Sequence, residues 1–126
     1  MKSLVLIPVI VLAAACASGS GGSATRSSDR SMLTPEEIAK AGSRDAYTAV
    51  QTLRPHWLSN RGPSSFRQNV VVKVYLDGNM LGGPEYLRQI TISSVSSIRH
   101  MDGLEATQRY GLDHGAGAIL VFTREQ

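Results

Sequence analysis

The sequence predicts a small α+β domain in which short helices pack on a mixed sheet. Residues 118–123 form an unbroken apolar run, which is typical of a central strand covered on both faces. Residues 70–76 form a valine-rich run with one lysine that precedes a turn sequence, which indicates a strand that enters a hairpin. Apolar residues recur at helical spacing before and between these runs. The order that we expect is helix, hairpin, helix, strand, helix, strand.

The first helix is predicted to begin at the sequence Thr-Pro-Glu-Glu. Thr34 can cap the helix, Pro35 suits its first turn, and Glu37 completes a capping box. Gly42 then weakens the helix, and we expect Ser43 to cap a second one.

The second helix is predicted to place its apolar side chains toward the core and to end before Pro55. Trp57 and Leu58 follow, and we expect them to fold back onto the sheet. Residues 60–65 are loop by composition. The side chains at helical spacing are Ala46, Tyr47, Val50 and Leu53.

The hairpin is predicted from residues 70–81. The strand has Lys73 and Tyr75 on a partly solvated face and turns at Asp77-Gly78-Asn79, and Met80-Leu81 return as a short strand. The apolar face carries Val70, Val72, Val74 and Leu76.

Three further elements complete the sheet and its helices. Residues 84–90 predict a short helix with Tyr86, Leu87 and Ile90 inward, and residues 97–101 predict a strand. Residues 103–110 predict a helix that ends at Gly111. Its side chains available for packing are Leu104, Ala106, Thr107 and Tyr110.

The N-terminus carries the pattern of a bacterial lipoprotein signal. Lys2 precedes an apolar stretch, and small residues lead to Cys16, the single cysteine. A lone cysteine forms no internal disulfide, and the apolar stretch is shorter than the roughly 20 residues of a membrane span. Resemblance to lipoproteins implies cleavage before Cys16 and its acylation, which anchors the chain in a membrane. Ala17 and Ser18 follow instead of the aspartate that retains lipoproteins in the inner membrane, which implies the outer membrane, facing the periplasm.

This pattern divides the chain into three parts. Residues 1–15 are the expected signal peptide, 16–33 the acylated cysteine with a flexible Gly/Ser-rich tether, and 34–126 one folded domain. Removal of the signal takes one basic residue from 13 and leaves 12 against 10 acidic ones. This near-neutral balance, with basic residues scattered singly, excludes a nucleic-acid-binding protein.

Three segments in register resemble the plug domain of TonB-dependent outer-membrane receptors, especially the SusC-like branch. They are Val72–Gly78, Val95–Met101, and Glu105–Gly111 continuing to Gly115–Thr123. The family pattern is a strand ending in Asp-Gly, a second strand, and then a helix that leads through Tyr-Gly and a glycine-rich turn into the last strand. The resemblance covers roughly residues 70–124.

The resemblance implies structural roles for the matching residues. Asp77 and Gly78 form a tight turn, Ala106 and Thr107 allow a helix to approach the sheet, and Tyr110 is an aromatic handle. Three glycines end the helix and turn the chain into the last strand, namely Gly111, Gly115 and Gly117.

These roles imply a non-catalytic interaction module of the envelope without cofactors or metals. The sequence as given holds no barrel, so we expect a stand-alone plug-like lipoprotein. Its expected partners are the membrane through Cys16 and an outer-membrane barrel or a TonB-system protein. We expect binding at the edges around 77–83 and 113–117, or strand addition to the last strand if one of its sides is unpaired.

Other functions have weaker support in the sequence. A small-ligand site would be lined by Trp57 and Tyr75, and a basic patch would join Arg99, His100 and Arg109. Neither a metal-binding spacing nor a phosphate loop opening a helix is present, and no G-x-S-x-G motif surrounds a serine. The polar residues that would serve in such sites are His100, Asp102, Asp113 and His114 for a metal, and Ser93 or Ser94 with His100 and Asp102 for hydrolysis.

Overall fold

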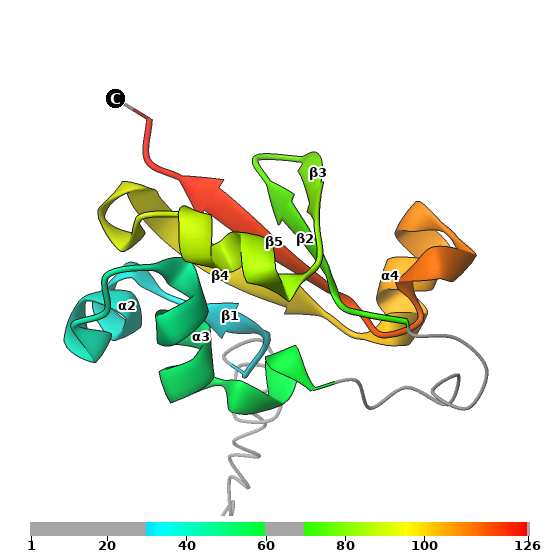
Figure 1. The fold of residues 1–126 in the computed structure, drawn as a ribbon, viewed down its shortest axis with the longest axis horizontal. Coiled ribbons are helices and arrows are strands. Elements are labelled where there is room, and N and C mark those ends of the chain that lie inside the picture. The colour runs from blue at the N-terminus through cyan, green and yellow to red at the C-terminus, as the bar shows by residue number, and fades with distance from the viewer. Residues whose placement is uncertain (1–29, 60–69, 126) are drawn as a thin grey trace, which may run out of the picture.

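The computed structural model describes residues 30–59 and 70–125, which form a mixed α+β fold around one open sheet (Figure 1). The expected signal peptide, Cys16 and most of the tether lie outside the described residues, as does the loop at 60–65. Along the chain the elements are β1 (Met32–Leu33), α2 (Pro35–Ala41), α3 (Ala46–Leu53), η1 (Pro55–Leu58), β2 (Lys73–Leu76), β3 (Asn79–Gly82), η2 (Pro84–Gln89), η3 (Ile92–Ser94), β4 (Val95–Met101), α4 (Gly103–Tyr110), η4 (Leu112–His114) and β5 (Ala118–Thr123).

The sheet has five strands in the order β1-β4-β5-β2-β3. The last strand, β5, is central, since it pairs with β2 in parallel and with β4 in antiparallel fashion. The prediction of a central β5 is therefore confirmed, and strand addition to β5 is excluded. The edges are β3 and the two-residue β1.

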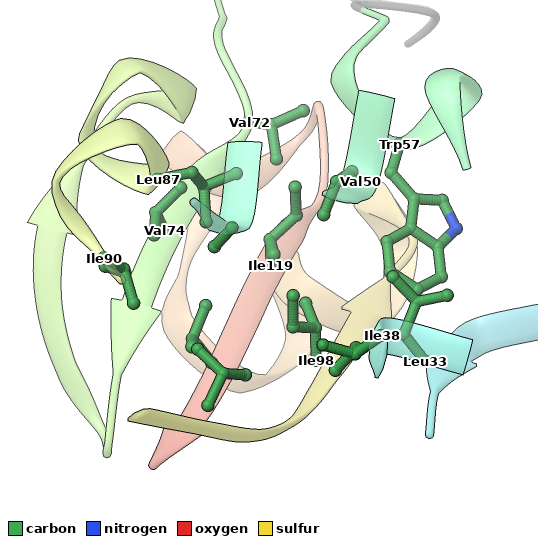
Figure 2. Packing of buried hydrophobic residues seen from close by; sticks show 13 residues of the cluster. Leu33, Ile38, Val50, Trp57, Val72, Val74, Leu87, Ile90, Ile98 and Ile119 are labelled. Atoms are coloured by element: carbon green, nitrogen blue, oxygen red, sulfur yellow. The ribbon is translucent and has the colours of Figure 1, made fainter. Parts of the chain in front are cut away.

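One face of the sheet carries the main core, formed by 13 buried residues beneath α2, α3, η1 and η2 (Figures 1 and 2). Trp57 in η1 is 1% exposed, so it folds back onto the sheet as predicted. In Figure 2, labelled side chains of the helices meet labelled side chains of the strands. They include Leu33, Ile38, Val50, Trp57, Val72, Val74, Leu87, Ile90, Ile98 and Ile119.

Local sequence signals explain several elements. The Thr34 hydroxyl accepts from the Glu37 amide at 3.3 Å, and the Glu37 carboxylate accepts from the Thr34 amide at 3.1 Å, which confirms the capping box. Asp77 and Gly78 both have positive φ, 48° and 87°, as a type I′ hairpin turn requires. Helix α4 spans the predicted residues, and Gly111 follows it with φ 107°.

Other elements differ from the prediction. Asp45, not Ser43, caps α3, since its carboxylate accepts from the Thr48 amide at 2.8 Å. Strand β1 lies at the end of the predicted tether, and its Leu33 is fully buried. Strand β2 begins three residues later than predicted, at Lys73, although Val72 is fully buried.

Two predicted inward side chains point elsewhere. Tyr86 is 37% exposed, because residues 84–89 form a 3-10 helix whose geometry differs from the expected α-helical spacing. Leu104 is 71% exposed, since only Ala106 of α4 is fully buried against the sheet.

Candidate interaction surface

The face of the sheet opposite the main core contains one row of residues that crosses all five strands. The strand register aligns Met32 with Arg99, Arg99 with Leu120, Leu120 with Tyr75, and Tyr75 with Met80. Alternation along a strand places such aligned side chains on one face. We call this set, with Phe122 two residues beyond Leu120 on the same face, the outer row.

Helix α4 covers this face at one end only. Asp102 caps the helix, since its carboxylate accepts from the Glu105 amide at 2.8 Å. Ala106 is fully buried, and the Tyr110 ring stacks on the Tyr75 ring with centroids 4.5 Å apart. The second cluster of buried residues that results comprises Tyr75, Met101, Ala118 and Leu120 beside Ala106. Ala106 and Tyr110 of α4 therefore pack against this face of the sheet.

Beyond α4, the outer row is exposed at three apolar side chains. Met32 is 40% exposed, Phe122 38% and Met80 58%. Exposed apolar residues scattered singly are ordinary, but these three surround Leu120 on one face and lie on β1, β5 and β3. No described helix covers them, so this face is the main candidate for binding another molecule.

One member of the outer row, Arg99, is charged and pairs with a residue of α4. The Arg99 guanidinium lies 3.0 Å from the Glu105 carboxylate. Both side chains are more than one-third exposed, so the pair contributes little to stability. Lys73 lies on the same face, two residues from Tyr75 along β2, and forms no ion pair with another described residue. Among the described residues, this face therefore combines apolar side chains with the cation of Lys73, which has no ion pair there.

Tyr75 and His114 form a buried polar pair under α4. The Tyr75 hydroxyl lies 2.8 Å from His114 Nε2, and His114 Nδ1 lies 3.3 Å from the Gly111 carbonyl oxygen. A carbonyl only accepts, so Nδ1 carries the hydrogen and Nε2 accepts from the tyrosine. Burial, and then Tyr110, raise the pKa of Tyr75. Tyr75 is therefore neutral. Its hydrogen bond to His114 connects β2 to the loop after α4, so the pair has a structural role.

Asp77 fixes the β2–β3 turn to the end of β5. Its carboxylate accepts from the Thr123 amide at 2.9 Å and from the Thr123 hydroxyl at 2.7 Å. These two hydrogen bonds lower the pKa of Asp77. Because Thr123 adjoins Phe122, and Met80 follows the turn, Asp77 sets the spacing of two exposed residues of the outer row. This residue acts as a positioning group for the surface.

Glycines allow α4 and the following loop to approach the sheet. A Cβ on Gly103 would collide with the Gly115 carbonyl oxygen, and one on Gly117 would lie 2.6 Å from the Met101 oxygen. Gly117 has φ 99°, which confirms its predicted sharp turn. Gly115 has φ −59° and so needs no glycine for its conformation; its carbonyl instead requires Gly103 to be small.

The structure does not bring together the residues of the alternative metal and hydrolase sites. His100 aligns with Ile119 on the main-core face, whereas His114 contacts Tyr75 on the opposite face. Among residues 30–59 and 70–125, no three His, Cys, Asp or Glu side chains group as metal ligands. Ser93 and Ser94 precede β4 and His100 lies near its other end, roughly 20 Å away at the rise of a strand.

The residues of the alternative small-ligand site, and those of the alternative basic patch, are also separated by the sheet. Trp57 and Tyr75 are buried on opposite faces, so they do not line one site. Arg99 and His100 are neighbours in β4 and point to opposite faces, since Arg99 contacts Glu105 and His100 stacks on Trp57. The Arg109 guanidinium lies over the Tyr110 ring at 5.7 Å.

His100 occupies an unusual position for a histidine. Its ring stacks on Trp57 with centroids 5.3 Å apart and an interplanar angle of 12°. Burial, with a further contribution from His56, lowers the pKa of His100 to about 4, and Asp102 opposes this shift. His100 is therefore neutral at pH 7 and serves as a packing residue.

The outer row was missed in the sequence because its members come from five separate strands. The period of two in residues 70–76 identified the face that holds Tyr75, whereas β1 has only two residues and so carries no detectable pattern.

In the described part of the chain, no helix has both the length and the apolar character needed to cross a membrane. No protein-family model matches this sequence, and none of the curated proteins matches it either.

Proposed function

We propose that this chain is a non-catalytic, lipid-anchored interaction module of the bacterial cell envelope, and that the outer row binds a partner protein. The observation that carries the proposal is the exposure of Met32, Met80 and Phe122 together on a sheet face that α4 covers at one end only. Apolar surface rimmed by charged residues is typical of a binding site.

The anchor follows from the sequence. Cys16 ends a lipoprotein-type signal, and acylation there would hold the domain at the periplasmic face of the outer membrane. The partner that follows from the plug-like pattern is an outer-membrane barrel or a TonB-system protein. Tethering both molecules to one membrane raises their effective concentration, so a small surface is sufficient for association.

The contacts of His100 and His114 support a role without catalysis. His114 is held between Tyr75 and the Gly111 carbonyl, and His100 stacks on Trp57. Both make packing or hydrogen-bonding contacts that stabilise the fold, and within residues 30–59 and 70–125 neither belongs to a group of three or more potential metal ligands.

Site-specific photocrosslinking in intact cells tests this proposal. A photoreactive phenylalanine derivative replaces Phe122 or Met80, with a tag after Gln126 and Cys16 unchanged. The control places it at Gln51, which is exposed on α3. We expect a defined adduct with an outer-membrane barrel or a TonB-system protein from positions 122 and 80 only. Equal labelling from position 51, or no protein adduct, would contradict the proposal.

Membrane attachment is tested separately with Cys16→Ser. The variant keeps the size of the side chain and removes the thiol that the acyl group requires. We expect the wild-type chain in the outer-membrane fraction and an unprocessed or unlipidated variant outside it. If wild type and the Cys16→Ser variant were distributed equally between the fractions, anchoring through Cys16 would be contradicted.

A further inference from the structure

Two leucines at one end of the molecule are exposed and belong to no surface described above. Among residues 30–59 and 70–125, Leu104 and Leu112 are the most exposed large apolar side chains, at 71% and 89%. Neither is part of the outer row, because Leu104 lies on α4 and Leu112 on η4. A single exposed leucine is ordinary, whereas two that share a surface form an apolar contact area.

Helix geometry places both leucines on the side of α4 that points away from the sheet. Ala106 is the fully buried residue of α4, and Leu104 and Gln108 each lie two residues from it, on the opposite side of the helix. Gly111 follows Leu104 by two helical turns, and Leu112 adjoins it. We call Leu104, Gln108 and Leu112 the α4 crest. None of its three side chains is charged.

The chain enters the fold at the same end of the sheet. Strand β1 pairs with β4 in antiparallel fashion, with Met32 opposite Arg99. The start of β1 therefore adjoins the part of β4 that ends at Met101 and leads into α4. Arg99, the partner of Met32, also contacts Glu105 of α4 at 3.0 Å. The residues that precede β1 thus join the domain close to α4.

The segment before this point leads back to the proposed lipid anchor. Residues 17–29 separate Cys16 from the described residues, and a Gly/Ser-rich chain of that length spans roughly 20 Å. The membrane that holds Cys16 is then within reach of the α4 crest, at a high effective concentration. This step rests on the proposed function, because it requires the acylation of Cys16. It makes a lipid surface the occupant that the α4 crest meets first.

We propose that the α4 crest docks on the membrane that holds Cys16, with the side chains of Leu104 and Leu112 inserted into the lipid interface. Apolar side chains buried at the interface add to the attachment by the acyl chains. Docking also orients the domain. Phe122 lies at the end of β5 away from Ala118, which pairs with Met101 beside α4, so Phe122 stays open to a protein partner.

Quenching of a fluorophore by labelled lipids tests the docking. The mature, acylated protein is bound to vesicles of phosphatidylethanolamine and phosphatidylglycerol, some of whose lipids carry a nitroxide on the acyl chain. Acylation occupies the sulfur of Cys16, so the fluorophore attaches only to a cysteine introduced by Leu104→Cys or Leu112→Cys. Met80→Cys is the matched control, because Met80 is exposed and apolar but lies on the edge strand β3. We expect quenching at positions 104 and 112 to exceed that at position 80 about twofold or more.

A second set of variants separates the leucines from the fluorophore. Gln108→Cys carries the fluorophore at an exposed position between the two leucines. In this background, Leu104→Ser combined with Leu112→Ser should reduce quenching about twofold or more. Tyr86→Ser should leave quenching unchanged, because Tyr86 is exposed on η2, away from α4. Far-ultraviolet circular dichroism of each variant verifies that it is folded.

Three outcomes would contradict the docking, and they separate it from the proposed function. Equal quenching at positions 104, 112 and 80, in protein that sediments with the vesicles, would overturn the docking and leave the lipid anchor in place. A defined protein adduct in intact cells from a photoreactive residue at position 104 would overturn it too, because the occupant would be a protein. Equal fractionation of wild type and Cys16→Ser would remove the anchor itself, and the docking with it.

Discussion

The two faces of the sheet differ in how many side chains they bury and how many they expose. The core cluster between the main-core face and α2, α3, η1 and η2 contains 13 buried residues, whereas the cluster between the outer face and α4 contains five, and Met80 on the outer face is 58% exposed. Buried apolar area stabilises the fold, and exposed apolar area is available to a partner. We infer that the main-core face supplies most of the stability and the outer face most of the capacity for binding. Substitutions on each face test this division.

The largest effect is expected at Trp57, the largest fully buried side chain. Trp57→Ala removes the aromatic surface that packs on the core and on His100, and should lower the free energy of unfolding by about 3–5 kcal/mol. Urea unfolding followed by far-ultraviolet circular dichroism measures it, because the substitution removes the single tryptophan. Trp57→Phe should lose clearly less, and equal losses would argue against a packing role.

A smaller effect is expected for the buried pair beneath α4. Tyr75→Phe leaves His114 Nε2 without its donor in a buried site, which should cost about 1–3 kcal/mol. Tyr110→Phe is the matched control, since it keeps the ring stack and removes a hydroxyl from a half-buried side chain. Thermal unfolding compares the two. A greater loss from the Tyr110 variant would show that the Tyr75–His114 hydrogen bond is unimportant.

The free energy of unfolding should depend on pH, because His100 packs on the main-core face with a lowered pKa. Its folded pKa of about 4 lies below the ordinary 6.5, so the unfolded chain takes up the proton more readily. The contribution of neutral His100 is complete above pH 6.5, falls as the pH decreases, and is lost below about 4. Urea titrations from pH 7 to 4 should show this loss in wild type and a flatter profile in His100→Gln.

Asp77→Asn provides the control for that pH window. The lowered pKa of Asp77 means that its contribution is present above the ordinary 3.8 and is lost only as the pH falls through its lower folded value. The Asn variant should therefore keep the wild-type slope between pH 6.5 and 4. If the free energy of unfolding of this variant depended less on pH than that of wild type, His100 would not be the cause of the wild-type pH dependence.

The smallest stability effect is expected on the outer row. Phe122→Ser and Met80→Ser change exposed side chains, so the free energy of unfolding should stay within about 0.5 kcal/mol of wild type. Phe122→Ser should also abolish the in-cell adduct of a probe at position 80, and Met80→Ser that of a probe at position 122. Urea unfolding of the purified variants measures stability, and crosslinking in cells measures binding. A decrease of more than about 2 kcal/mol in the free energy of unfolding would show that these residues belong to the core.

Sequence patterns predicted most elements because their signals are local. The capping box at Thr34 and the helix before Gly111 each involve residues three or four apart. The 3-10 helix at 84–89 was read as α-helical, since the spacing of Leu87 and Ile90 fits both. Strand β1 was missed because two residues carry no periodicity and pair only through β4.

The sequence by itself determined the fold class, the Asp77-Gly78 turn and the central, apolar β5, since each depends on neighbours within one strand or turn. Only the tertiary structure decided which residues share a surface. Tyr75 meets His114 across 39 positions, and Asp77 meets Thr123 across 46. Such contacts arise from strand order and register, which depend on packing of the whole sheet, so no local period in the chain encodes the outer row.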